Sequence, residues 1–305
     1  MSPSKLSAGI SSVARPIIIL LLLSCFETAA AQLPTPIYFE QVLEKRLASE
    51  SPGGNATSEK FCPVSNDLVA ARILESYGAV FVASDLVRLP PRCIHRSEAE
   101  VARFQAKFAK KALEMNGVRI ELQTAAATAL ESAVRDIGAE DLTITPLDGS
   151  IAAGRSYGDT LMLWNSRVFP AMEFWIRRGR LSPSAPDEIG RLDLQKKVEK
   201  VIEWESQGIY FSSDRTRSIL TSTAPPGTSQ HLYLVAFDVS EFWNPEIRSI
   251  LNRNGWFQTV IDDPAHFTYL GFSEAELPAR GLTAVAKGGH QYWVPHLRPR
   301  ANSTN

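Results

Sequence analysis

The chain has 305 residues, of which 44% are hydrophobic and 21% charged, and its formal net charge is −1. These proportions are typical of a folded globular protein and exclude an intrinsically disordered chain. A near-neutral charge without long runs of one sign disfavours nucleic-acid binding, which usually needs a basic face. The length is sufficient for one main domain and a smaller appendage.

Residues 1–31 have the composition of a signal peptide. Lys5 and Arg15 precede an apolar run at residues 17–26, and an alanine triplet then matches the small-residue cleavage pattern. The apolar run is too short to span a bilayer, so we expect export without a transmembrane span. A second interpretation is a lipoprotein, with a lipid anchor on Cys25. Both interpretations place the protein in the periplasm or outside the cell.

Two cysteines, Cys62 and Cys93, remain in the mature chain. In an exported protein such a pair favours a disulfide, and two separate buried thiols are the alternative. Neither cysteine belongs to a CxxC pattern, which disfavours a metal site at these residues.

The first part of the mature chain predicts an N-terminal helical module at residues 32–117. Residues 32–60 predict irregular structure, and residues 66–83 predict a capped helix that stops at Gly78 and continues as a short strand. A capping-box spacing predicts a helix over residues 97–115, which ends at an Asn-Gly pair. This module contains the expected disulfide.

The second part, residues 118–275, predicts an α+β domain, and residues 276–305 predict a C-terminal tail that frays from residue 297. A small, mostly antiparallel sheet should carry helices on one side. The predicted helices are 121–137, 157–178 with a break or kink near Pro170, 192–207 and 244–254; the predicted strands are 142–145, 232–239 and 266–270; and residues 182–190 predict a loop.

Two of the five histidines lie in segments typical of a metal site. His231 begins the segment HLYLVAFD, which ends at Asp238, and His266 follows Asp263 in DPAH. A catalytic zinc ion takes three protein ligands of the histidine or carboxylate type and keeps a fourth position open. Asp263 is placed to accept a proton from a water molecule, although Asp262 competes for that role.

The pattern SxHxxxxxxD, starting at Ser229 and followed by DxxHF, resembles the M15 group of zinc peptidases. This group includes D-alanyl-D-alanine carboxypeptidases, D-Ala-D-Ala dipeptidases and L-alanyl-D-glutamate endopeptidases. The resemblance covers residues 120–272 and implies Zn²⁺ held by His231, Asp238 and His266, with Asp263 as general base. It also implies that Arg155, in a Gly-Arg-Ser segment, binds the substrate carbonyl or carboxylate. The pair Gly255-Trp256 is a further match.

The sequence departs from the family at two positions. Leu234 replaces the usual glycine, and Ala265 replaces the usual tryptophan or proline. His231 and Asp238 are seven residues apart, so one regular strand would direct them to opposite faces. They can share a metal only if the chain turns or bulges between them, or if His231 precedes the strand.

We therefore expect a zinc peptidase that hydrolyses peptidoglycan stem peptides, of the D-Ala-D-Ala carboxypeptidase type. An L-Ala-D-Glu endopeptidase of the same fold and a non-catalytic wall-binding or zinc-binding module are the alternatives. Ser229 should orient either a substrate group or the His231 loop, and Arg155 has a structural alternative as the partner of Asp159 or another acid. The remaining histidines predict a structural role for His95 and exposed loop positions for His290 and His296.

Overall fold

The computed structural model describes residues 36–50 and 57–299. Residues Ile37–Asn305 form one compact unit. The predicted signal peptide at residues 1–31, including Cys25, lies outside the described residues. Within the part of the chain that the structure describes, no helix has both the length and the apolar character needed to cross a membrane.

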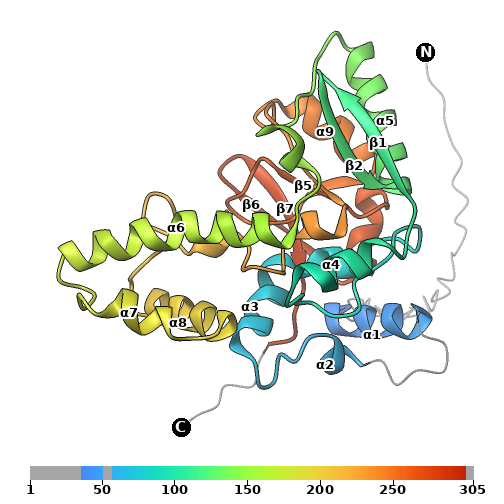
Figure 1. Ribbon diagram of the computed structural model, residues 1–305. Helices are drawn as coiled ribbons and strands as arrows, with labels where there is room; N and C mark the ends of the chain where they lie inside the picture. The colour runs from blue at the N-terminus through green and yellow to red at the C-terminus, as the bar shows by residue number, and fades with distance from the viewer. Residues whose placement is uncertain (1–35, 51–56, 300–305) are drawn as a thin grey trace, which may run out of the picture. The chain divides into compact units, whose positions relative to one another are not determined.

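The protein is a mixed α+β structure, as the sequence predicts (Figure 1). Its helices are α1 (Phe39–Glu50), α2 (Ser58–Phe61), α3 (Leu68–Tyr77), α4 (Glu98–Gln105), α5 (Thr124–Ala139), α6 (Tyr157–Arg177), α7 (Ala185–Gly190), α8 (Leu194–Ser206) and α9 (Pro245–Arg253). Its strands are β1 (Lys110–Met115), β2 (Val118–Gln123), β3 (Ala236–Asp238), β4 (Trp256–Gln258), β5 (His266–Tyr269), β6 (Leu282–Lys287) and β7 (His290–Pro295). Five 3-10 helices complete the described residues: η1 (Gly78–Val82), η2 (Gly149–Ala152), η3 (Ile219–Thr221), η4 (Gln230–Tyr233) and η5 (Glu274–Arg280).

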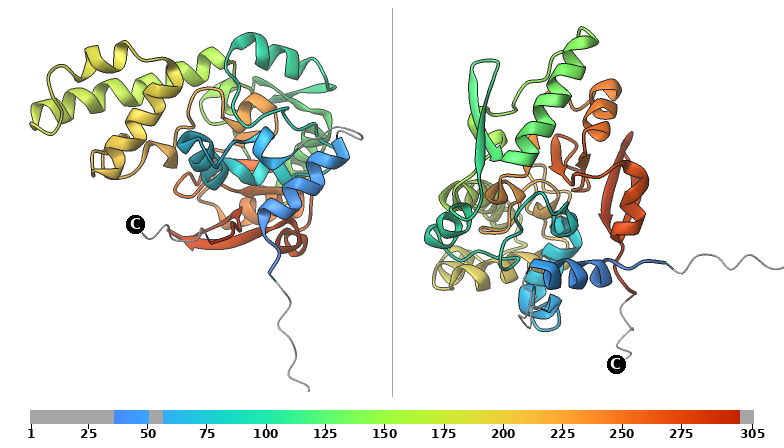
Figure 2. Two further views of the ribbon diagram at one scale, coloured as in Figure 1. Left: turned by 90° about the horizontal axis from the view of Figure 1, so that it is seen from below. Right: turned by 90° about the vertical axis from the view of Figure 1, so that its right-hand side faces the viewer.

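The three strands β3, β5 and β4 form the central antiparallel sheet, with β5 in the middle. Two further antiparallel hairpins, β1–β2 and β6–β7, make separate two-stranded sheets. Helices α5 and α9 pack against each other, and in Figure 2 both lie beside the small sheets. The main hydrophobic core contains Phe39 of α1, Leu130 of α5 and Phe267 of β5, so it joins residues from both sides of the predicted boundary at 117 and 118.

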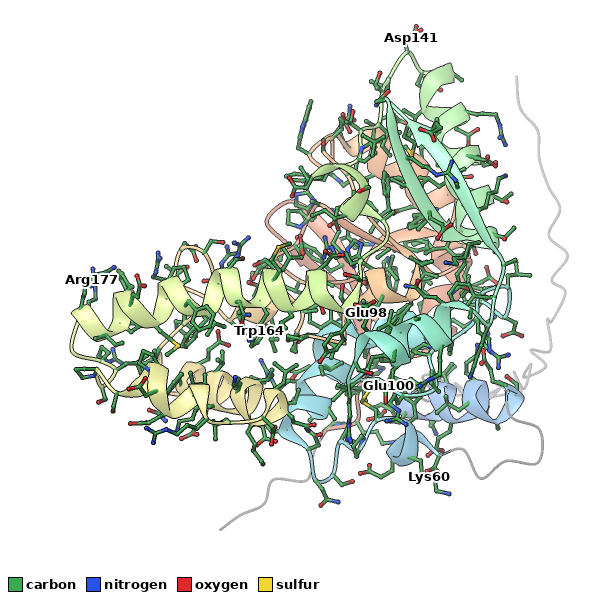
Figure 3. The ribbon with its side chains drawn as sticks, viewed as in Figure 1. Lys60, Glu98, Glu100, Asp141, Trp164 and Arg177 are labelled. Atoms are coloured by element: carbon green, nitrogen blue, oxygen red, sulfur yellow. A yellow bond between two sulfur atoms is a disulfide. The ribbon has the colours of Figure 1, made fainter. Side chains whose placement is uncertain are left out.

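A second hydrophobic core lies between α6 and the pair α7–α8, which run side by side in Figure 1. Trp164 of α6 and Val201 of α8 are among its fully buried side chains. Figure 3 shows Trp164 on the side of α6 that faces α8, with Arg177 at the far end of the same helix. The hydroxyl of Ser156 caps the start of α6 by accepting from the backbone N–H of Asp159 at 3.0 Å. Helix α6 continues through Pro170, so the predicted break is absent from this helix.

Two predictions were wrong because they missed β-hairpins. The predicted helix over 97–115 ends at Gln105, and its second half is strand β1, which pairs with β2. Asn116 and Gly117 both have positive φ, as a tight hairpin turn requires, so this pair turns the chain instead of ending a helix. The predicted tail likewise contains the β6–β7 hairpin, which turns at Gly288 and Gly289.

Further segments also differ from prediction. Residues 32–60, predicted to be irregular, contain helix α1 and the start of α2. Residues 78–82 form the 3-10 helix η1 instead of a strand. Residues 142–145 form no strand, although the adjoining Pro146 makes an isolated bridge to Val239. The predicted loop at 182–190 contains the short helix α7, which has a proline in its first turn.

The predicted disulfide between Cys62 and Cys93 is present, and it links positions 31 residues apart. Both cysteines are buried. We expect the double variant Cys62→Ala/Cys93→Ala to lose about 3–4 kcal/mol of unfolding free energy, because the open loop gains entropy in the unfolded chain. Urea unfolding of the oxidised wild type and of the variant measures this difference. A loss below about 1 kcal/mol would contradict the expectation.

Candidate metal and active site

Asp238 and His266 are brought together by strand pairing. They lie directly opposite each other in the antiparallel β3–β5 pair. Side chains at opposite positions of such a pair project from the same face and stand next to each other. Nδ1 of His266 lies 3.0 Å from Oδ1 of Asp238. The register of the central sheet therefore fixes two of the three predicted metal ligands.

His231 reaches the same point because it precedes the strand. It lies in the 3-10 turn η4, and the Ser229 hydroxyl accepts a hydrogen bond from its backbone N–H at 3.4 Å. Leu234 then adopts the left-handed conformation, with φ of 55°, before β3 begins. The zinc-peptidase pattern that the sequence resembles has glycine at this position, and glycine adopts that conformation without steric cost. Leucine thus makes the required turn, and its side chain is buried.

The three predicted ligands offer a triangle of acceptor atoms. Nε2 of His231 lies 3.1 Å from Nδ1 of His266 and 3.3 Å from Oδ1 of Asp238, and the third side of the triangle is 3.0 Å. Ligand atoms of a tetrahedral zinc site stand about 3.3 Å apart, given Zn–N and Zn–O distances of about 2.0–2.1 Å. The donor types and their spacing therefore fit Zn²⁺ with three protein ligands.

Hydrogen bonds behind the triangle leave the inward nitrogens free to coordinate. Nδ1 of His231 faces the carbonyl oxygen of Ala153 at 3.1 Å, and Nε2 of His266 faces Oε1 of Gln230 at 2.9 Å. Both partners accept hydrogen bonds, so we infer that these outer nitrogens carry the protons. Burial lowers the pKa of His231 to about 4, which keeps its ring neutral. The inward lone pairs then face one another and a carboxylate, an arrangement that a cation stabilises.

Gln230 is a functional residue that the sequence analysis did not identify. It is buried, and its amide nitrogen donates to the carbonyl oxygen of Tyr77 in α3 at 2.9 Å. This bond defines which amide atom faces His266 and so fixes the orientation of that ring. In the sequence, only the position of Gln230 directly before His231 could have drawn attention to it.

Arg155 contacts a predicted ligand directly. Its Nη2 donates to Oδ2 of Asp238 at 2.6 Å, and its Nε donates to the carbonyl oxygen of Ile151 at 3.0 Å. Asp159 instead belongs to the capping box of α6, so it is not the partner of Arg155. Burial opposes ionisation of Asp238, but the contacts with His231 and His266 outweigh it and hold the pKa of Asp238 well below its usual value. Asp238 is thus a carboxylate with one oxygen on Arg155 and the other in the triangle.

Asp263 lines the same cleft as Asp238, one of the three residues of the triangle. A cavity of about 160 Å³ is lined by residues that include Arg155, Ser229, Asp238 and Asp263. Burial raises the pKa of Asp263 to about 7, assisted by the negative charge of Asp238 and opposed by His266 and Arg155. A group whose pKa lies near neutrality can both accept and return a proton.

The adjacent acid, Asp262, faces elsewhere. Its carboxylate pairs with Nζ of Lys287 at 2.7 Å and lies 3.9 Å from Nη1 of Arg217. The two acids that competed in the sequence thus differ in surroundings, because only Asp263 lines the cleft. Asp262 has φ of 69° and anchors the turn that presents Asp263.

The other histidines lie outside the triangle. His95 is buried between the rings of Phe104 and Tyr233, and burial lowers its pKa to about 4. His290 lies in β7, where Nδ1 faces Nε2 of Gln258 at 3.2 Å, and Nδ1 of His296 faces the carbonyl oxygen of Ile37 at 3.2 Å. The predicted loop position was wrong for His290, which starts β7, whereas His296 lies in the loop after that strand. Both are partly buried, so the predicted exposure was wrong for both.

The segment between the cleft residues Ala224 and Ser229 depends on a glycine. Gly227 has φ of +83°, and a Cβ at this position would meet the carbonyl oxygen of His95 at 1.9 Å. The same backbone approach forms a hydrogen bond from the His95 N–H to the Gly227 carbonyl oxygen at 2.9 Å. The segment that leads into Ser229 can therefore pack this closely only with glycine at this position.

We expect Gly227→Ala to lower the unfolding free energy by about 3–5 kcal/mol, since backbone atoms would have to move apart. Gly179→Ala is the matched control, because Gly179 also has positive φ but open space around its Cβ position. That control should lose only about 1 kcal/mol. Urea unfolding of both variants tests the difference. Equal losses of unfolding free energy would contradict the role of the close backbone approach at Gly227.

Comparisons with known proteins give limited guidance. No protein-family model matches the chain. No curated protein matches it either. One similar solved structure is a variant of the vancomycin-resistance D,D-pentapeptidase VanY, from a VanB-type resistance cassette, in complex with Zn(II). Its sequence is 16% identical, the match covers 57% of this chain and 85% of that chain, and the TM-score is 0.32. Another is VanYB in complex with D-alanine-D-alanine, which is 17% identical, covers 58% of this chain and 86% of its own, and has a TM-score of 0.34. At such TM-scores the likeness decides nothing about function, so the proposal below depends on the site itself.

Proposed function

We propose that this protein is a zinc peptidase that hydrolyses stem peptides of peptidoglycan. The observation that carries the proposal is the convergence of His231, Asp238 and His266 on one point, beside a cleft that both Asp238 and Asp263 line. Three ligands of these types with an adjacent carboxylate form the minimal set for metal-assisted amide hydrolysis. Motif order in the sequence and geometry in the structure support the same assignment.

When bound, zinc would acidify a water molecule and polarise the carbonyl group of the scissile bond. Asp263 accepts a proton from the attacking water and later returns it to the leaving amine. His231 and His266 are held in the coordinating orientation by the Ala153 carbonyl and by Gln230. The chain thus supplies both a fixed ligand set and a proton carrier.

Arg155 has two roles in this proposal. Two of its donors hold Asp238 and the Ile151 carbonyl, which positions the ligand carboxylate. Its side chain also lines the cleft, so its remaining donors are available for the substrate carbonyl oxygen, where negative charge develops during attack. Ser229 lines the same cleft and caps the turn that carries His231. We assign Ser229 to orientation of that turn and of the bound peptide.

Digestion of purified peptidoglycan, followed by mass spectrometry of the fragments, tests the proposal. Loss of a single alanine from pentapeptide stems identifies a D-Ala-D-Ala carboxypeptidase, which is the activity we propose. Release of the stem peptide at the L-Ala-D-Glu bond identifies the endopeptidase alternative. No zinc-dependent cleavage of either bond would contradict the proposal and leave a non-catalytic module. His266→Ala serves as the control for contaminating hydrolases.

A peptidoglycan substrate requires export, so the proposal includes a periplasmic or secreted location. The predicted signal peptide at residues 1–31 supports it, and Cys25 remains the candidate site of a lipid anchor. Mass measurement of the mature protein from membrane and soluble fractions distinguishes cleavage after the alanine triplet from lipidation.

A further inference from the structure

Two guanidinium groups line the candidate active-site cleft, and only one of them has an acidic partner. Arg155 is paired with Asp238. Arg167 lines the same cleft, and no carboxylate pairs with it among residues 36–50 and 57–299. Within these residues, the side chain of Arg167 makes one hydrogen bond, from Nη1 to the hydroxyl of the neighbouring Ser166 at 3.3 Å. Its Nε is buried and has no hydrogen-bond partner among them. Arg167 is therefore a partly buried cation with free donors.

Helix α6 places Arg167 on the face that lines the cleft. Thr160, Leu163 and Arg167 follow each other at spacings of three and four residues, so they share one face of the helix, and all three line the cleft. Long side chains on a helix lean toward its N-terminus. The N-terminus of α6 follows directly after Arg155. Arg167 and Arg155 therefore line one cleft, and this tendency favours a guanidinium of Arg167 that leans toward the Arg155 side.

The chemistry of the group indicates an anionic ligand with two oxygens. A planar guanidinium forms paired hydrogen bonds with a carboxylate, and partial burial without a partner is costly unless a ligand supplies one. The cleft holds about 160 Å³, below the roughly 300 Å³ typical of sites for drug-sized ligands. A short chain end fits such a space better than the middle of a long peptide. The C-terminal carboxylate of a peptide therefore matches both the guanidinium and the small space.

We propose that Arg167 binds the free C-terminal carboxylate of the peptide and thereby makes the protein selective for exopeptidase cleavage. This inference rests on the proposed function, because it assigns a specificity residue to the same cleft. It also favours the carboxypeptidase over the endopeptidase alternative. Arg167 acts on binding and selectivity, and it leaves the metal ligands and Asp263 unchanged.

The test compares an N-acylated Lys-D-Ala-D-Ala peptide that has a free carboxylate with the same peptide as its C-terminal amide. The zinc-loaded wild type should cleave the acid about 10- to 100-fold faster in kcat/KM than the amide. Arg167→Met should abolish this ratio by slowing cleavage of the acid alone, and Arg167→Lys should restore part of it. Arg177→Met is the matched control, because Arg177 lies at the far end of α6 (Figure 3) and is 68% exposed.

A binding measurement separates this inference from the proposed function. Calorimetry with D-alanyl-D-alanine and its amide, on protein carrying Asp263→Asn, reports selectivity without turnover. Selective binding that Arg167→Met removes supports the inference even if the wild type hydrolyses no peptide, in which case the proposed function alone fails. Equal cleavage or binding of acid and amide by the wild type overturns the inference. The inference is also overturned if Arg167→Met, with normal melting temperature and zinc content, keeps the selectivity. The same holds if this variant binds the acid and the amide more weakly by the same factor.

Discussion

Asp263→Asn is expected to lower kcat for peptide hydrolysis by about 10²- to 10⁴-fold, the usual contribution of a positioned general base. Asparagine has nearly the same shape, and the backbone contacts of this position with Val260 and His266 need no carboxylate. The change therefore removes the proton acceptor and leaves the loop in place. Zinc content should stay at the wild-type value, because Asp263 is not one of the three atoms of the ligand triangle.

Asp262→Asn provides the matched control for that experiment. The two acids are neighbours in sequence, but Asp262 pairs with Lys287 and does not line the cleft. Asparagine tolerates the left-handed conformation that Asp262 adopts. We expect a change in kcat of less than about 10-fold for this control, since general-base loss alone accounts for more. If Asp262→Asn were the inactive variant and Asp263→Asn the active one, the assignment would be reversed.

The second large effect that we expect is a loss of stability when the metal is removed. A ligand that binds only the native state at about 1,000 times its Kd adds about 4 kcal/mol. For a protein of this size, that free energy corresponds to a fall in melting temperature of about 8–15 °C on chelation. The cause is local, since the metal-free site leaves three acceptor atoms within 3.3 Å of one another.

His231→Ala should remove this sensitivity to chelator. The variant lacks one ligand and leaves the Ala153 carbonyl without its partner, so it should melt below the zinc-loaded wild type at every chelator concentration. Its melting temperature should not change when chelator is added. Differential scanning calorimetry of both proteins, with and without chelator, measures the effect. A wild type whose melting temperature is the same under both conditions would show that the triangle binds no stabilising metal.

Helices with clear end signals could be predicted from the sequence. Ser156 and Asp159 form the capping box that starts α6, and Asn244 caps α9, whose end is followed by Gly255 in the left-handed conformation. These signals are local, so no tertiary contact is needed to interpret them. The disulfide could also be predicted from the sequence, because two cysteines in an exported chain leave one simple pairing.

The hairpins were missed because local sequence and tertiary pairing favour different structures. Residues 107–115 are rich in lysine, alanine and leucine, which favour a helix. In the structure, cross-strand contacts prevail: Lys110 pairs with Glu121 at 3.1 Å, and Glu114 lies opposite Arg119. The Asn-Gly pair that joins the strands is a strong hairpin signal, and it should have outweighed the helical pattern.

The candidate site was predictable in its side chains but not in their supports. The resemblance to a known peptidase pattern implied the three ligands, Asp263 and Arg155, and the structure brings these residues together. The path between His231 and Asp238 could not be predicted, because it depends on a leucine in the left-handed conformation. The Ala153 carbonyl could not be predicted either, since any residue offers a backbone oxygen. Gln230 acts through Tyr77, a contact across 153 positions that no local pattern encodes.

The central claim is that His231, Asp238 and His266 hold one zinc ion. Elemental mass spectrometry of the purified mature wild type and of His266→Ala, prepared side by side, tests it most directly. The account predicts about one zinc per chain in the wild type and a large loss in the variant, because two remaining ligands cannot hold the ion tightly. Absence of zinc from both proteins, or equal zinc in both, would contradict the claim.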